Sequence, residues 1–199
     1  MVPLMRQLGN RKLILAGCAA AVLLIVIGAA AWLRHAAAPA AFAADPARAL
    51  AAFAAPRAPL THPRAVPEGE REYHNAVYHF SLLYPDTLTG AEYDEAGGGH
   101  TITFEDADDT HAFQVYIVSY ASSTISDARF LLDEPSGVRT QPTSVVIDGV
   151  TGTMFFGNNP VMGDTREVWF IHGGFLYEVT TYKDDDAWLA GIMQTWQFI

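Results

Sequence analysis

The sequence predicts an α+β domain built on an antiparallel sheet, and three observations lead to this fold class. Short segments that alternate apolar and polar residues follow one another between residues 79 and 182, and turn residues separate them. Two of these turns, Asp148-Gly149 and Gly173-Gly174, are typical of tight hairpins, which join antiparallel strands. Two amphipathic helical patterns, one between the strands and one at the C-terminus, are available to cover the sheet.

The first expected strands occupy residues 79–84, 100–104 and 111–120. A short polar segment joins the second to the third, so we expect these two to pair as a hairpin. That pairing places His100 and His111 at opposite ends, which argues against a metal site shared by both.

Two further hairpins are expected in the second half of the domain. A type I′ turn at Asp148-Gly149 joins residues 144–147 to 150–156, because both central residues of that turn need positive φ. A two-residue loop at Gly173-Gly174 fixes a register in which four apolar residues share one face: Phe170 opposite Tyr177, and Val168 opposite Val179. The other face carries further large apolar residues, so we expect both faces to be at least partly covered: Trp169, Ile171 and Leu176.

Two helices are expected to provide that cover. The first spans residues 124–133 and begins with a capping-box-like pair, Thr124 and Asp127. Its apolar residues are Ile125, Ala128, Leu131 and Leu132. The second begins at Asp184-Asp185-Asp186, whose carboxylates are favourable at a helix N-terminus. Its apolar stripe is Trp188, Leu189, Ile192, Met193 and Trp196.

Residues 13–33 form an apolar run of twenty-one residues that contains the single cysteine, Cys18. As a helix this run is about 32 Å long, which matches the hydrocarbon core of a bilayer. The sequence therefore predicts one transmembrane anchor. Three basic residues precede it, so the positive-inside rule makes residues 1–12 a cytoplasmic basic tail. We expect a single-pass membrane protein whose domain is extracytoplasmic.

Two other interpretations of the apolar run stay open. A cleaved signal peptide would use Ala41-Phe42-Ala43, although the run is longer than the usual signal-peptide core. A lipobox at residues 15–18 would lipidate Cys18, although only five apolar residues precede that cysteine. The length of the run and the charge asymmetry around it favour the uncleaved anchor.

The rest of the chain divides into a spacer and a domain. Residues 34–67 hold fifteen alanines and six prolines, a composition that predicts an extended, semi-rigid linker. Residues 68–199 are the expected domain and hold twenty-one acidic but only five basic residues. So acidic a surface repels phosphate backbones and anionic lipid head groups, which excludes nucleic acid and favours a basic partner or a cation.

Several short motifs of the domain resemble the PsbP-like family. They are Tyr78-His79-Phe80-Ser81-Leu82-Leu83-Tyr84-Pro85, Val146-Ile147-Asp148-Gly149, Gly174-Phe175-Leu176-Tyr177 and Ile192-Met193-Gln194-Thr195-Trp196-Gln197-Phe198. The resemblance covers about residues 73–199. It implies an α/β/α sandwich on an antiparallel sheet, in a family that includes the photosystem II extrinsic protein and many bacterial secreted or membrane-anchored proteins. Turn glycines and buried aromatic residues dominate these motifs, so they bear on the fold rather than on an activity.

The sequence offers two weak candidates for a functional site. Four carboxylates cluster between the strands 100–104 and 111–120, and oxygen ligands of this kind suit Ca²⁺: Glu105, Asp106, Asp108 and Asp109. The EF-hand glycine and distal glutamate are absent, so a solvated hairpin tip is the alternative. Three aromatic residues could form a recognition patch or lie under a helix as core: Tyr116, Tyr120 and Trp169.

The sequence contains no known catalytic motif: it has no G-x-S-x-G, H-E-x-x-H, P-loop or C-x-x-C. We therefore expect a non-enzymatic, membrane-tethered binding or accessory module that needs no cofactor and recognises a protein partner, of which a basic one suits the acidic surface. The alternative is an envelope hydrolase or metal-dependent enzyme that uses carboxylates and a histidine, which would require these groups to meet in one pocket.

Overall fold

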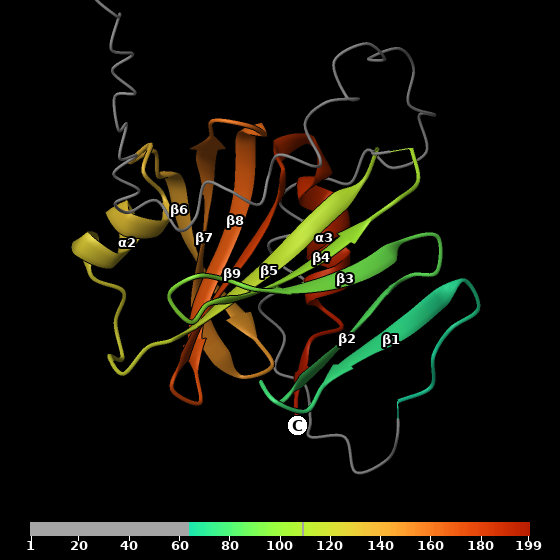
Figure 1. Ribbon diagram of the computed structural model, residues 1–199. Helices are drawn as coiled ribbons and strands as arrows, with labels where there is room; N and C mark the ends of the chain where they lie inside the picture. The colour runs from blue at the N-terminus through green and yellow to red at the C-terminus, as the bar shows by residue number, and fades with distance from the viewer. Residues whose placement is uncertain (1–63, 109) are drawn as a thin grey trace, which may run out of the picture.

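The computed structural model describes residues 64–108 and 110–199, which form two antiparallel sheets and two short α-helices (Figure 1). The larger sheet has seven strands. In their order across the sheet these are β3 (Thr89–Asp94), β4 (His100–Glu105), β5 (Ala112–Ser119), β9 (Phe175–Tyr182), β8 (Gly163–His172), β7 (Val150–Asn159) and β6 (Thr140–Ile147). The smaller sheet consists of β1 (Glu70–Asn75), β2 (Phe80–Pro85) and β10 (Gln197–Phe198).

The expected anchor and most of the expected linker lie outside the described residues, as does Asp109. Within the described part of the chain, no helix is long and apolar enough to cross a membrane. The single-pass anchor at residues 13–33 therefore stays a prediction.

The three predicted hairpins are confirmed. Asp148 and Gly149 have φ values of 45° and 83°, as a type I′ turn requires, and they join β6 to β7. The Gly173-Gly174 turn joins β8 to β9 with Phe170 opposite Tyr177, the predicted register. In the β4–β5 hairpin the partners include Ile102 with Val115 and Phe104 with Phe113.

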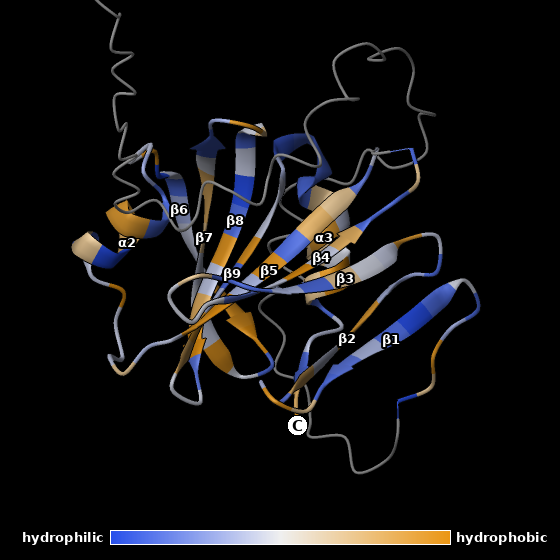
Figure 2. Cartoon of the chain, in the orientation of Figure 1, coloured by the Kyte–Doolittle hydropathy of each residue, from blue (hydrophilic) through white to orange (hydrophobic). Residues whose placement is uncertain are grey.

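The prediction of a single sheet is wrong in one respect. The segment predicted at residues 79–84 is β2, but it pairs with β1 and with β10 in a separate three-stranded sheet. Figure 2 shows β1 as mainly hydrophilic. Only one of its six residues, Asn75, is buried, and it is polar, which explains why no apolar alternation marks β1 in the sequence. The chain end reaches this sheet because β10 follows directly on the C-terminal helix.

The inner face of the seven-stranded sheet packs against the three-stranded sheet and α3 (Asp186–Met193), which a 3₁₀ turn, η3 (Lys183–Asp185), precedes. Four residues of the predicted stripe are buried: Leu189, Ile192 and Met193 of α3, and Trp196 just after it, are all at most 5% exposed. The fifth, Trp188, is only partly buried. Trp196 stacks on Phe80 of β2 with ring centroids 4.2 Å apart. One core therefore joins the two sheets.

The outer face of the seven-stranded sheet packs against α2 (Asp127–Asp133), but this helix differs from the prediction. It begins after Ser126, whose hydroxyl accepts a hydrogen bond from the Arg129 amide, rather than at Thr124. The predicted inward residues Leu131 and Leu132 are 55% and 64% exposed. The helix instead turns Phe130 toward the sheet, and this is its one buried residue, packed against Phe155 and Trp169.

Gly152 of β7 is expected to tolerate no side chain, because a Cβ there would lie 2.8 Å from the Trp169 carbonyl oxygen and 3.0 Å from Phe170 Cβ. We expect Gly152→Ala to lower the free energy of unfolding by about 1–3 kcal/mol, the usual cost of overpacking. Urea denaturation measures it. Gly191→Ala in α3 is the control, since its Cβ would meet no atom within 4 Å. An equal loss in both variants would contradict this packing.

Candidate functional site

The predicted acidic loop forms a hydrogen-bonded turn between β4 and β5. Asp106 accepts hydrogen bonds from the amide and the hydroxyl of Thr110, at 2.7 and 2.5 Å. Burial raises the pKa of Asp106, but these bonds and one from the His111 amide outweigh it, and the net pKa lies below its ordinary value. Asp108 is exposed. Glu105 ends β4, and no group of three or more His, Cys, Asp or Glu in the described chain is arranged to hold a metal. Calcium binding at this loop stays a prediction.

The three predicted aromatic residues do not form one exposed cluster. Trp169 is 3% exposed and packs between Phe130 and Phe155 as core. Tyr116 is half-buried beside Arg129. Tyr120 donates its hydroxyl to the Thr124 carbonyl oxygen, which ties down the segment before α2. These rings therefore help to hold α2 on the sheet.

Four carboxylates lie beneath α2 on the outer face of the sheet, a feature that the sequence analysis missed. They are Asp133, Glu134, Glu167 and Glu178. The side chains of the last three residues come from three elements, and each of these residues is at most 6% exposed. Arg129 is the cation of this cluster: it forms ion pairs with Asp133 and, at 3.9 Å, with Glu178. A buried group of like charges is stable only if some members keep a proton.

Burial raises the pKa of two members of this cluster strongly, Glu167 and Glu178. Burial raises the pKa of Glu167 to about 7, although Thr180 and Trp169 donate hydrogen bonds to its Oε2 at 2.7 and 3.2 Å. Burial, and then the neighbouring Asp133, raises the pKa of Glu178 well above its ordinary value. This cluster is enclosed by α2, so we assign it to the stability of the outer layer.

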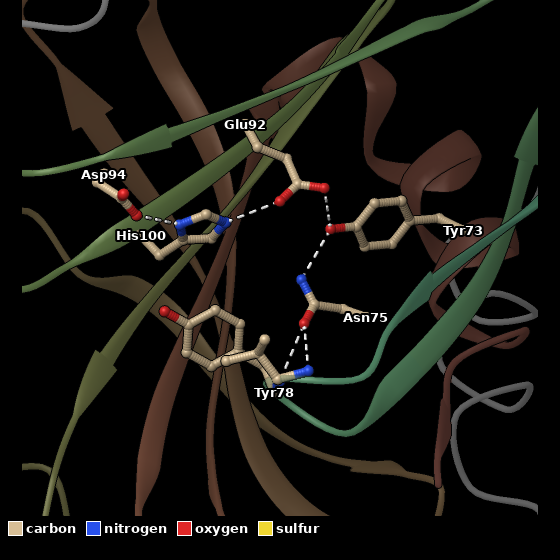
Figure 3. Close-up of polar contacts among 7 residues, drawn as sticks. Tyr73, Asn75, Tyr78, Glu92, Asp94 and His100 are labelled. Carbon is tan, nitrogen blue, oxygen red and sulfur yellow. Dashed lines mark hydrogen bonds and ion pairs between the residues drawn. The ribbon is translucent and has the colours of Figure 1, made fainter.

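The second polar cluster lies at the rim between the two sheets, where residues of β1, β3 and β4 meet (Figure 3). Its centre is His100, the first residue of β4, whose Nδ1 is 2.9 Å from Asp94 Oδ1 and whose Nε2 is 3.1 Å from Glu92 Oε2. Both carboxylates belong to β3, where alternation places them on one face of the strand. Their side chains are 49% and 96% exposed, respectively for Glu92 and Asp94.

The rim cluster also includes residues of the smaller sheet. Tyr73 of β1 donates its hydroxyl to Glu92 at 2.8 Å and accepts a hydrogen bond from the Asn75 amide at 2.9 Å. The Asn75 side-chain oxygen in turn accepts the backbone amides of Val77 and Tyr78, which shapes the turn into β2. Glu92 therefore links β3 to β1 as well as to His100, and the rim joins the two layers.

The sequence held a signal for this rim, but it needed strand β3 to be recognised. Glu92 and Asp94 alternate before Gly97-Gly98-Gly99, and a hairpin across these glycines pairs Asp94 with His100. The composition of β3 is poor in apolar residues, so periodicity alone does not mark it.

Fold and rim together define an acidic α+β domain with two antiparallel sheets and a solvent-facing polar rim at one sheet edge. No family model matches the sequence, and no curated protein is similar to it.

The solved structures that are similar to the chain include two from bacteria. The solution structure of cyanobacterial PsbP from Synechocystis sp. PCC 6803 is 14% identical, covers 71% of this chain and 100% of that chain, and gives a TM-score of 0.49. A crystal structure from Bacteroides thetaiotaomicron is 15% identical, covers 66% of this chain and 49% of that chain, and gives a TM-score of 0.44. The first carries the name of the family that the sequence resembles.

Tyr73→Phe tests whether the rim holds the two layers together. The ring keeps its contacts with Phe80 and Phe104, but the Asn75 amide loses its acceptor and Glu92 loses a donor. We expect the free energy of unfolding to fall by about 1–2 kcal/mol. Chemical denaturation measures it, with the exposed Tyr93→Phe as a control that changes little. An unchanged Tyr73→Phe variant would mean that the rim bonds add nothing to stability.

Glu167→Gln tests the buried carboxylates. The pKa of Glu167 is raised from its ordinary 4.5 to about 7, so between these pH values the folded state holds a proton that the unfolded state has released. Stability from this group is therefore fully present below about pH 4.5 and is lost as pH rises through 7, by at most about 1.4 kcal/mol per pH unit.

We expect the free energy of unfolding, measured in urea between pH 5 and 8, to fall less steeply with pH in Glu167→Gln than in the wild type. Exposed Glu68→Gln should keep the wild-type slope. The slope is reduced rather than abolished, because Glu178 and Asp133 also have raised pKa values. Equal slopes in all three proteins would show that Glu167 is already ionised in this range.

Proposed function

We propose that the protein is a membrane-tethered, extracytoplasmic accessory module whose acidic domain binds a basic protein partner. The observation that carries this proposal is the distribution of charge pairs. Of the six Arg and Lys side chains in the described residues, five form ion pairs with carboxylates of the same domain: Arg64, Arg129, Arg139, Arg166 and Lys183. The domain therefore has almost no cation left to offset its remaining acids.

The excess of acidic over basic residues gives the domain a negative electrostatic potential. Some of the pairs are themselves internal, such as Arg166, which is 6% exposed and donates two hydrogen bonds to Asp186. The rim presents two exposed carboxylates that both contact His100, Glu92 and Asp94, and neither is paired with an Arg or Lys in the described residues. Such a surface speeds association with cationic partners and disfavours nucleic acid and anionic lipid.

The expected anchor and linker set where this binding takes place. An uncleaved anchor at residues 13–33 keeps the domain in the envelope, and the proline-rich residues 34–67 hold it away from the bilayer. The tether raises the local concentration of the domain near other membrane proteins, so a modest affinity for the partner is sufficient.

The enzyme alternative requires two carboxylates and a histidine to meet at a site open to substrate. His100, Glu92 and Asp94 do meet, but each ring nitrogen of His100 lies within 3.1 Å of a carboxylate oxygen. Neither nitrogen faces a substrate in this arrangement, so the geometry favours a binding role over general-base catalysis.

Capture from a membrane extract of the source cell tests the proposed function. The full chain, held in nanodiscs, is used as bait at 50 mM and at 500 mM NaCl. We expect one basic protein to be retained at low salt, and the amount retained to fall at least tenfold at high salt, since screening weakens surface charge interactions. Empty nanodiscs control for lipid binding, and retention that ignores salt would contradict charge-based recognition.

The tether has its own readout in the same preparation. An intact N-terminus in the membrane fraction supports the anchor. A mature chain that starts at Ala44 or at Cys18 would contradict it in favour of cleavage or lipidation.

A further inference from the structure

We propose that β3 is the docking edge of the domain: an extended basic segment of the partner adds to the seven-stranded sheet beside β3 and places its cationic side chains against Glu92 and Asp94. This inference deepens the proposed function and rests on it. It specifies which part of the acidic surface binds, and it specifies the conformation and side-chain pattern of the segment that is bound.

β3 is an edge strand. Among the described residues its backbone is paired in the sheet with β4 alone, and five of its six residues are exposed. Its side-chain contact with the smaller sheet is the hydrogen bond from Tyr73 to Glu92. At about 3.4 Å per residue the strand is roughly 20 Å long, enough for a peptide of six residues. Strands β2 and β1 are drawn beside β3 in Figure 1, but they belong to the smaller sheet, which shares the core of the larger sheet and forms no ladder with β3.

The two edges of the seven-stranded sheet differ in how they are protected. The opposite edge, β6, contains Pro142, its register with β7 shifts between Thr140 and Thr143, and Gln141 has a φ of 51°. Proline and irregular register are common devices that keep an edge from pairing with another chain. β3 has neither: its six residues pair with β4 in continuous register, and it contains no proline or lysine.

The side chains of β3 define the partner. Glu92 and Asp94 lie two residues apart on one face, so an added strand would carry basic residues at alternate positions. Directly opposed residues on neighbouring strands lie about 5 Å apart, within reach for Lys or Arg to meet these carboxylates. Tyr93 points to the other face and is 42% exposed, which suits an apolar residue between the two cations.

A second copy of the chain is a poor occupant of this edge. Pairing of β3 with β3 would bring the acidic side chains of one copy beside those of the other, and like charges directly opposite are destabilising. The partner is therefore a different chain of opposite charge.

The test uses the full chain in a neutral maltoside detergent and a fluorescent hexapeptide of alternating lysine and valine. Fluorescence anisotropy measures its dissociation constant. A second peptide has the same sequence but carries N-methyl groups on alternate backbone nitrogens, which removes the amide donors needed for strand pairing and leaves every charge in place. We expect the N-methylated peptide to bind the wild type at least tenfold more weakly. Equal binding by both peptides would overturn strand addition.

Two variants locate the binding site. Asp94→Lys changes an exposed residue of β3, and Asp127→Lys makes the same charge change at an exposed residue of α2, on the other layer. We expect Asp94→Lys to weaken the lysine–valine peptide at least tenfold and Asp127→Lys to change it less than twofold. Equal effects of the two variants would overturn the assignment to β3. Circular dichroism verifies that both variants are folded. The comparison with the N-methylated peptide uses the wild type, so it does not depend on the folding of a variant.

The same variants separate this inference from the proposed function. If the captured partner is retained by Asp94→Lys as by the wild type, the acidic domain binds its partner elsewhere and the β3 assignment is wrong. If the wild type retains no protein in a salt-dependent way, the proposed function is wrong, and the peptide experiment still reports on the edge by itself.

Discussion

The stacking of Trp196 on Phe80 is the contact on which the architecture depends. The two rings are nearly parallel, 4° apart, and both residues are at most 1% exposed. Trp196 also meets Phe170 and Tyr177 of the seven-stranded sheet edge to face. Its Nε1 has no hydrogen-bond partner within the described part of the protein, so apolar and aromatic burial outweighs the cost of that lost bond. A three-stranded sheet this small is held in place by this core rather than by its own ladder.

The outer layer is held differently. There α2 has seven residues and one buried aromatic ring, and charge compensation beneath it supplements a small apolar cluster. The two faces of one sheet thus differ in chemistry: the inner face is sealed by aromatic packing, and the outer face by carboxylates that share protons and one arginine. The rim at β3 combines aromatic packing with polar contacts, because the Tyr73 ring packs against Phe104 and its hydroxyl donates a hydrogen bond to Glu92.

The sequence predicted the parts of the fold whose signals are local. Asp148-Gly149 and Gly173-Gly174 demand positive φ, and that demand sets both hairpins and their register. The second sheet could not be predicted in this way, because β10 is two residues long and β1 is polar. Both strands owe their conformation to long-range pairing rather than to their own composition.

The candidate sites followed the same division. Glu167 and Glu178 are polar residues at alternate positions of strands, a pattern that predicts exposure to solvent. The sequence does not show that a helix covers them, so the buried cluster could not be predicted. Leu131 and Leu132 show the converse, because these apolar residues are exposed while Phe130 faces the sheet. The rim required knowledge of β3, which its partner β4 stabilises more than its own residues do.

The closure of β2 by β10 also governs when the domain can fold. Ser81 pairs with Gln197, so almost the whole domain lies between two neighbouring residues of one small sheet. Contacts so distant in sequence form slowly, because a long loop must close before they contribute. The core between the two sheets is therefore completed late in folding, when Trp196 and β10 reach β2.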